Sequence, residues 1–255
     1  MNRMIRRRFS VFRGVGAKTE QTIWRAGLAD WSDYLALQGR PPVGAGLHRR
    51  LSAQIARWHE ALQRSDHRFF AGRLKRAEHW SLYAAFNGKV RYLDIETTGL
   101  DPRRDRVTMV GVHDGRHFHA LVRGRDLDTA ALQQAFAGCK LLVSFFGSVF
   151  DVPFLRQAFP ALQLDQPHYD LCHAARRLGL TGGLKHIERE IGIQRPTELA
   201  EVDGFEAVRL WHRHRQGDPT ALETLTAYNH QDTENLIHLA RHLYQRLARA
   251  TAMAP

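Results

Sequence analysis

The chain has 255 residues, of which 44% are hydrophobic and 25% are charged, values typical of a globular protein that buries a sizeable core. Lysine and arginine number 37 against 26 acidic residues, so the formal net charge is +11. This excess favours a polyanionic partner, either a nucleic acid or an acidic membrane surface. No apolar run is long enough to span a bilayer, which argues against the membrane alternative.

The two cysteines, Cys139 and Cys172, do not form a Cys-x-x-Cys pair. A structural zinc site and a disulfide framework are therefore not expected, and we interpret both as small buried hydrophobic side chains. Several arginines lie within residues 3–8, but no apolar signal segment follows them. We accordingly expect a cytoplasmic protein.

Residues 1–87 are expected to form a helical N-terminal region. Gly14-Val15-Gly16 breaks the chain ahead of a helix predicted from Ala17 to Ala26, which Gly27 ends. Further along, Leu51, Ile55, Trp58 and Leu62 repeat at helical spacing. The turn signal Asn87-Gly88 marks the boundary with the rest of the chain.

The glycine hairpin resembles the second half of a helix-hairpin-helix motif. In that motif glycines bring the backbone close to a phosphate, and free N–H groups at the start of the next helix point at it. The resemblance implies that nucleic acid, mostly DNA, is contacted by Arg13, Gly14, Gly16 and Lys18. Glu20 departs from the motif because a small residue is usual there. A helical unit that only packs against its neighbours is the alternative interpretation.

Residues 88–255 have the pattern of a mixed α/β domain. Apolar runs predict strands over 90–95, 107–112, 117–122 and 140–146, with a helix over 126–136 before the last of them. Asp114-Gly115 is a hairpin turn, and Asp128 or Thr129 can cap the helix. Helices follow to the end of the chain. This order resembles a ribonuclease H-like fold, a mixed sheet flanked by helices.

Two acidic residues interrupt the first apolar run. Asp94 and Glu96 are two positions apart, so their side chains project from the same face of a strand. Neighbouring carboxylates in apolar surroundings repel each other and lose hydration, and a divalent cation with oxygen ligands is the simplest counterion. For this pair alone, an exposed strand end in contact with water or arginine is the simpler interpretation.

Two further segments carry acids. Asp151 follows the strand end at Gly147, near the start of the next helix, where the helix dipole favours an acidic side chain. Tyr228 and Asp232 lie in a helix predicted from Ala221 to Ala248 and share a face because they are four positions apart. Neither segment is informative on its own.

Taken in this order and spacing, the five residues resemble the motifs of the DEDD exonuclease superfamily in its tyrosine subgroup, DEDDy. The flanks Leu-Asp-Ile-Glu-Thr-Thr-Gly-Leu, Phe-Asp-x-Pro-Phe-Leu and Tyr-Asn-x-x-Asp-x-x-Asn-Leu are similar to the YprB-like branch of ribonuclease H-like proteins. The resemblance covers about residues 88–245. The histidine subgroup places its base where this chain has Ala227, so that subgroup is disfavoured. Phe146 stands where the second motif usually has Asn, so no polar contact to substrate is expected from its side chain.

The resemblance implies a 3′–5′ exonuclease that uses two divalent ions, Mg²⁺ or Mn²⁺. Asp94 would be the bridging ligand, and Tyr228 would orient the attacking water. The ions would be held by Asp94, Glu96, Asp151 and Asp232. The pocket for the terminal nucleotide would be lined by Thr97, Thr98 and Leu100.

The substrate and the class of protein have alternatives. The hairpin-like N-terminus favours DNA, as single-stranded 3′ ends, and a 3′–5′ exoribonuclease is the alternative enzyme. A non-catalytic nucleic-acid-binding subunit of a repair complex is the alternative from another class, against which the intact acids and tyrosine argue. Basic residues that could follow a nucleic-acid backbone are Arg103, Arg104, Arg123, Arg125, Arg176, Arg177 and Lys185.

Overall fold

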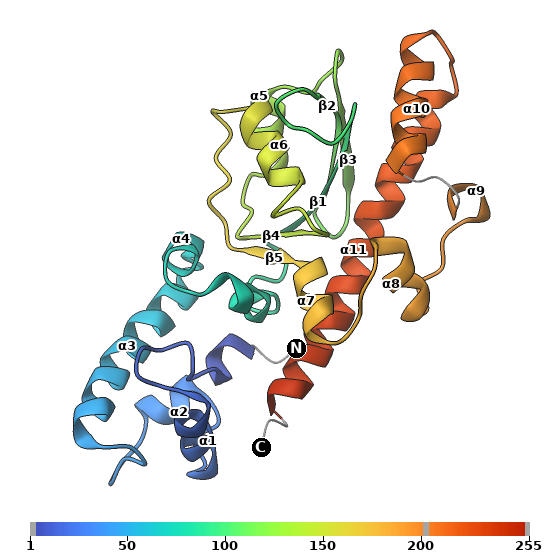
Figure 1. Cartoon of the computed structure of the whole chain (residues 1–255). Coiled ribbons are helices and arrows are strands. Elements are labelled where there is room, and N and C mark those ends of the chain that lie inside the picture. The colour runs from blue at the N-terminus through green and yellow to red at the C-terminus, as the bar shows by residue number, and fades with distance from the viewer. Residues whose placement is uncertain (1–3, 201–203, 253–255) are drawn as a thin grey trace.

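A five-stranded mixed sheet forms the centre of the C-terminal part of the molecule in the computed structural model, which describes residues 4–200 and 204–252 (Figure 1). The strand order is β3-β2-β1-β4-β5, so β1 (Val90–Thr97) is the middle strand. β1 pairs antiparallel with β2 (Val107–His113), which pairs antiparallel with β3 (Phe118–Val122). On its other side β1 pairs parallel with β4 (Leu141–Ser144), and β4 pairs parallel with β5 (His168–Asp170). The prediction of a mixed α/β sheet is confirmed.

The fifth strand is the element that the sequence did not predict. β5 has three residues, His168 to Asp170, and Asp170 already serves as the N-cap of the next helix. Three residues are too few to show an alternating pattern, and only pairing with β4 makes this segment a strand. The expectation that only helices follow the fourth strand is therefore wrong at this point.

Helices cover both faces of the sheet, and the longest described helix extends along most of the length of the sheet. On one side lie α5 (Thr129–Ala135) and α6 (Asp151–Ala158), and on the other α10 (Gly204–Arg215) and α11 (Ala221–Ala252) (Figure 1). α7 (Leu171–Arg177), α8 (Leu184–Glu190) and α9 (Thr197–Ala200) connect β5 to α10. Within the described ranges no helix is both long and apolar enough to cross a membrane.

Alternation along β1 decides which face of the sheet each side chain meets. Leu93 and Ile95 are buried in a hydrophobic cluster with residues of α5 and α6. The intervening positions, Asp94 and Glu96, therefore project toward the face that α11 covers. α11 contacts β1, β2 and β3, so its side chains reach the two acids directly.

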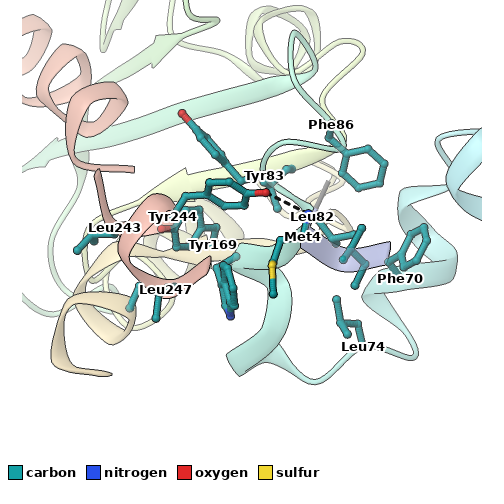
Figure 2. Close-up of a cluster of buried hydrophobic side chains, with 14 of the residues drawn as sticks. Met4, Phe70, Leu74, Leu82, Tyr83, Phe86, Tyr169, Leu243, Tyr244 and Leu247 are labelled. Atoms are coloured by element: carbon teal, nitrogen blue, oxygen red, sulfur yellow. Dashed lines mark hydrogen bonds between the residues drawn. The ribbon is translucent and has the colours of Figure 1, made fainter. Parts of the chain in front are cut away.

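The N-terminal region consists of short helices whose core continues into the sheet region. Its elements are η1 (Met4–Arg7), α1 (Ala17–Arg25), α2 (Trp31–Leu35), α3 (Ala45–Gln63), α4 (His67–Ala71) and η2 (Arg76–Leu82). Figure 2 shows Met4, Leu82 and Tyr83 beside Tyr169 and Tyr244, which come from β5 and α11. The Met4 backbone N–H donates to the Tyr244 hydroxyl at 3.1 Å. A single hydrophobic cluster thus crosses the boundary near residue 87, and the division into two domains stays a prediction.

The predicted glycine hairpin and the helix after it are present. Gly14 has φ +88°, a conformation that residues with a side chain rarely adopt, and α1 begins at Ala17 as predicted. Glu20 is buried, and its carboxylate accepts the backbone N–H groups of Phe9 at 2.6 Å and Ser10 at 2.8 Å. The departure from a small residue at this position therefore has a structural reason. The cysteines at 139 and 172 are free and buried, as expected.

Candidate active site

Asp94 and Glu96 meet the side chain of Asn229 from α11. The Asn229 amide nitrogen donates to Asp94 Oδ2 at 2.8 Å and to Glu96 Oε1 at 3.3 Å. Gly111 pairs with Asp94 in the sheet, and a Cβ at Gly111 would lie 1.8 Å from Asn229 Oδ1. Because only glycine leaves room there, Gly111 lets α11 approach β1 closely enough for this contact.

Asp151 enters the same region from the first turn of α6. Its side chain is buried. A Cβ atom at Gly147 would lie only 3.0 Å from Asp151 Oδ2, so the glycine leaves room for this carboxylate. Burial raises the pKa of Asp151, and the negative charge of Asp170 acts in the same direction. Gly147 thus allows the strand-to-helix turn to bring this acid toward β1.

The four acids Asp94, Glu96, Asp151 and Asp232, here called the acid cluster, interact although they come from distant parts of the chain. Burial raises the pKa of Asp94, as do the negative charges of Asp232, Glu96 and Asp151. Burial also raises the pKa of Glu96, with Asp232 and Asp151 adding to it. Such mutual repulsion arises only between carboxylates that the fold holds close together with little water between them.

Tyr228 lies on the same face of α11 as Asp232, as the four-residue spacing predicts. Its side chain is buried, and its hydroxyl interacts with the Asp232 carboxylate. The Lys185 ammonium lies 5.3 Å from the centre of the Tyr228 ring. Burial raises the pKa of Tyr228, and the charges of Asp232, Glu96 and Asp94 raise it further, so the phenol stays protonated at neutral pH.

An arginine that the sequence did not single out contacts the acid cluster. Two nitrogens of Arg195 donate to the Glu188 carboxylate at 2.5 and 2.7 Å, and Nη1 lies 2.5 Å from Asp232 Oδ1. Asn235 Nδ2 also donates to Glu188, at 3.1 Å. Glu188 is completely buried in α8. The sequence signal available for this network was Glu188, an acid on the apolar side of α8. No sequence pattern indicated a role for Arg195.

Of the predicted pocket residues after Glu96, Thr97 is the last residue of β1, and Thr98 and Leu100 lie in the loop between β1 and β2. Thr97 is buried, and its hydroxyl donates to the Gly99 carbonyl at 2.5 Å. The Thr98 hydroxyl donates to Asp105 at 3.2 Å and accepts the Arg106 N–H at 3.0 Å, which closes the loop. Leu100 is 74% exposed. Its apolar side chain is therefore free to contact a ligand, whereas both threonines are used within the loop.

Phe146 has an uncommon backbone conformation. Its φ is +61°, in the left-handed region that Asn tolerates and that costs most other side chains free energy. Asp170 stabilises the turn by accepting the N–H groups of Phe146 and Ser148, each at 3.0 Å, and the Ser148 hydroxyl at 2.6 Å. Asn, the usual residue at this motif position, adopts such a φ more easily than Phe. The backbone conformation seen at Phe146 is therefore one reason for Asn at this position, in addition to any contact that an Asn side chain could make.

The residues of the glycine hairpin lie apart from the acid cluster. Arg13, Gly14, Gly16 and Lys18 belong to α1 and the turn before it, which Figure 1 shows at the far end of the N-terminal region from β1 and β2. Lys18 lines a shallow hollow of about 300 Å³ between α1 and the start of α3. The structure therefore does not bring these residues together with the acids.

The donor set of the acid cluster fits a divalent cation, because carboxylate oxygens are the ligands that Mg²⁺ and Mn²⁺ prefer. In the described parts of the chain, however, no three His, Cys, Asp or Glu side chains have the spacing of a formed metal site. Asp94 and Glu96 both accept hydrogen bonds from the Asn229 amide, and Arg195 pairs with Asp232. The cluster thus has the ligands for a metal ion, and in this structure these ligands contact the protein donors Asn229 and Arg195.

The fold and this arrangement of acids define a ribonuclease H-like protein, and the chain belongs to the RNase_H superfamily, whose family model matches residues 91–244. That match spans more than half of the chain and all five predicted site residues. No curated protein matches the chain significantly.

Several solved structures are similar to this chain, and the one with a TM-score above 0.5 agrees with it in fold. The family B DNA polymerase from the hyperthermophilic archaeon Pyrobaculum calidifontis superposes with a TM-score of 0.51 and 20% identity over 64% of this chain. The chain spans only 25% of that polymerase. A nuclease in its apo form has a TM-score of 0.48 at 23% identity, covering 67% of this chain and 78% of its own. Brucella melitensis NrnC with bound Mg²⁺ has a TM-score of 0.47 at 22% identity, covering 65% and 76%.

Proposed function

We propose that the protein is a metal-dependent 3′–5′ exonuclease that hydrolyses phosphodiester bonds of nucleic acid. The observation that carries this proposal is the acid cluster: four mutually repulsive carboxylates, of which Glu96, Asp151 and Asp232 are buried and Asp94 is half-buried, lie beside Tyr228 in a ribonuclease H-like fold. Buried acids that repel each other lower the stability of the fold, so a functional reason is needed to explain them.

The chain supplies ligands, orientation and charge in this proposal. Asp94, Glu96, Asp151 and Asp232 would hold the ions. Two bound divalent ions would activate water and stabilise the leaving oxygen of the phosphodiester. The Asn229 amide, which already contacts Asp94 and Glu96, would keep both carboxylates oriented.

Tyr228 would orient the attacking water instead of removing its proton. Its raised pKa makes it a poor base at neutral pH, whereas its hydroxyl can still donate and accept hydrogen bonds. The exposed Leu100 would contact the terminal nucleotide, next to the backbone of Thr97 and Thr98. The proposed polarity and the DEDDy assignment are supported by the motif order alone.

DNA with a single-stranded 3′ end is the proposed substrate, and residues 1–87 are proposed to bind it away from the acids. The support is the glycine hairpin and the helix α1 that follows it. No side chain caps the N-terminus of α1, which lies near Arg13 and Lys18. An Arg13→Ala, Lys18→Ala double variant should then flatten the salt dependence of DNA binding, by up to about 0.9 in log–log slope per lost phosphate contact on duplex DNA and about 0.7 on a single strand. An unchanged slope would assign this segment to packing alone.

A non-catalytic nucleic-acid-binding protein is the second candidate, because one observation favours it. Asp232 is already paired with Arg195, and Asp94 and Glu96 with Asn229, so the apo cluster has partners without a metal. The first candidate hydrolyses nucleic acid at the acid cluster, whereas the second only binds it.

Digestion of matched substrates tests the proposal. Single-stranded DNA, duplex DNA and RNA of one sequence, each labelled at the 5′ end, are incubated with Mg²⁺, with Mn²⁺ or with excess EDTA. We expect a ladder that shortens from the 3′ end, only with metal, and fastest on single-stranded DNA. A faster ladder on RNA would select the exoribonuclease, and binding without any ladder would select the non-catalytic protein.

A further inference from the structure

A cavity of about 600 Å³ lies at the β5 edge of the sheet, and none of its lining residues belongs to the acid cluster. It is formed by η2, β5, α7 and the start of α6. Ser148 and Val152, on either side of Asp151 in the chain, line its wall. The cavity is therefore a neighbour of the proposed active site and a separate space.

Three arginines surround this cavity with little to neutralise them. Arg76 has no ion pair or hydrogen bond to any other residue in the described parts of the chain. Arg156 makes one long contact, 3.4 Å to the Leu164 carbonyl. Arg177 is held by the Ala77 carbonyl and lies 3.8 Å from Glu78. Two of the three guanidinium groups are thus available to an anion.

The two acids that line the cavity already have partners. Asp165 pairs with Arg68 at 2.5 Å and with His67 at 3.2 Å. Asp170 accepts hydrogen bonds from the loop before α6 and from the first turn of α7. Arg68 therefore balances the charge of Asp165, whereas Asp170 is bonded to neutral donors, so three arginines face one lining carboxylate that has no arginine partner.

The rest of the lining is partly apolar and partly polar. It includes Leu142, Val152, Leu164, Ala174 and Tyr169, together with Ser148 and the histidines His79, His168 and His173. Such a surface suits a flat heterocycle, and the volume lies within the usual range for small-molecule sites, about 300–1,000 Å³.

We propose that this cavity binds a nucleotide unit, with the base against its apolar side chains and the phosphate at Arg76 and Arg156. A nucleotide combines the anion that the arginines attract with a flat body that fits the apolar part of the lining. The proposal goes beyond the nuclease activity, because it involves no member of the acid cluster. The unit comes either from a free nucleotide or from a nucleic-acid strand.

Calorimetry on the full chain tests the proposal. The four 5′-mononucleotides, the matching nucleosides and inorganic phosphate are titrated in excess EDTA, so that no metal bridges a ligand to the acids. We expect at least one mononucleotide to bind saturably, and the Arg76→Gln, Arg156→Gln pair to weaken it about tenfold or more. The control pair Arg50→Gln, Arg57→Gln removes the same charge from α3, outside the cavity, and should leave the affinity within about twofold.

A second variant tests the site without changing charge. Ala77 is exposed at the cavity lining, so Ala77→Trp should obstruct the cavity without disturbing the core. We expect it to abolish mononucleotide binding while the unfolding midpoint stays the same. Equal affinity for phosphate and nucleotide, equal loss in the control pair, full binding by Ala77→Trp, or no saturable binding by wild type would each overturn the proposal.

The source of the nucleotide unit is read from one further titration. A 5′-phosphorylated dinucleotide that binds about tenfold tighter than its mononucleotide would assign the cavity to a nucleic-acid strand. Equal affinity would assign it to a free nucleotide. Both results support a nucleotide site, and they can be obtained whether or not the acid cluster cleaves nucleic acid.

Discussion

Arg195 Nη1 lies 2.5 Å from Asp232 Oδ1, and both side chains are more than nine-tenths buried. The same guanidinium is bound through two nitrogens to Glu188, whose side chain is 1% exposed. One buried cation therefore neutralises part of the acid cluster while a second acid holds that cation in place. This network explains how the fold tolerates the cluster when no metal is bound.

Removing the guanidinium should destabilise the fold strongly. Arg195→Met leaves Glu188 and Asp232 buried without their cation, which typically costs about 3–5 kcal/mol. Urea unfolding of Arg195→Met and of Arg57→Met, an exposed control on α3, measures this. The double variant Arg195→Met, Glu188→Leu should recover part of the loss, because one unpaired acid is removed with its partner. A free energy of unfolding for Arg195→Met equal to that of the control would show that the network is not needed.

The left-handed conformation of Phe146 predicts an uncommon ranking of substitutions. Glycine adopts a φ of +61° freely, whereas alanine pays the steric cost of its Cβ, so Phe146→Gly should be about 1 kcal/mol more stable than Phe146→Ala. Comparing these two variants cancels the loss of the phenyl ring. Chemical unfolding measures the difference, and a more stable alanine variant would contradict the conformation seen here.

The buried His168 predicts a loss of stability in acid. Burial lowers the pKa of His168 to about 4, and the charges of His79 and Arg76 act in the same direction while Asp170 opposes them. In the unfolded chain the histidine pKa is about 6.5, so as the pH falls through this window the unfolded state binds a proton first. Its contribution to stability is therefore present above about pH 6.5 and is lost as the pH falls toward 4.

His168→Gln tests this assignment. The variant should lose less stability between pH 6.5 and 4 than wild type does, by an amount on the order of a few kcal/mol. His119→Gln removes an exposed histidine and should follow wild type across the same range. Unfolding free energies at several pH values provide the comparison, and parallel curves for His168→Gln and wild type would refute it.

Tyr228 is expected to affect the rate of hydrolysis and not the affinity for metal. Tyr228→Phe keeps the ring beside Lys185 and removes the hydroxyl that contacts Asp232. We expect a decrease in kcat of about 10²-fold or more, the range for a positioned group that acts in the reaction, with little change in metal affinity. Single-turnover kinetics and metal titration measure the two separately, and an unchanged rate would remove the tyrosine from the mechanism.

The sequence predicted the parts of this fold whose signal is local. Alternation and apolar runs predicted β1 to β4, and the spacing of Tyr228 and Asp232 predicted their common face, because strand and helix periods act over a few residues. β5 was missed because three residues carry no period. Arg195 and Asn229 gained their roles only when α8 and α11 packed against the sheet, and such contacts between distant segments leave no local pattern. The cavity at β5 was invisible for the same reason.

The most direct test of the acid cluster as a metal site is a calorimetric titration with Mn²⁺ of wild type and of Asp94→Asn. Asn keeps the shape of Asp94 but removes the charge that is repelled by Asp232, Glu96 and Asp151. The proposed site predicts that wild type binds two ions and becomes more stable with metal, whereas Asp94→Asn binds weakly and gains no stability. Equal binding and equal stabilisation of the two proteins, or no binding by wild type, would contradict it.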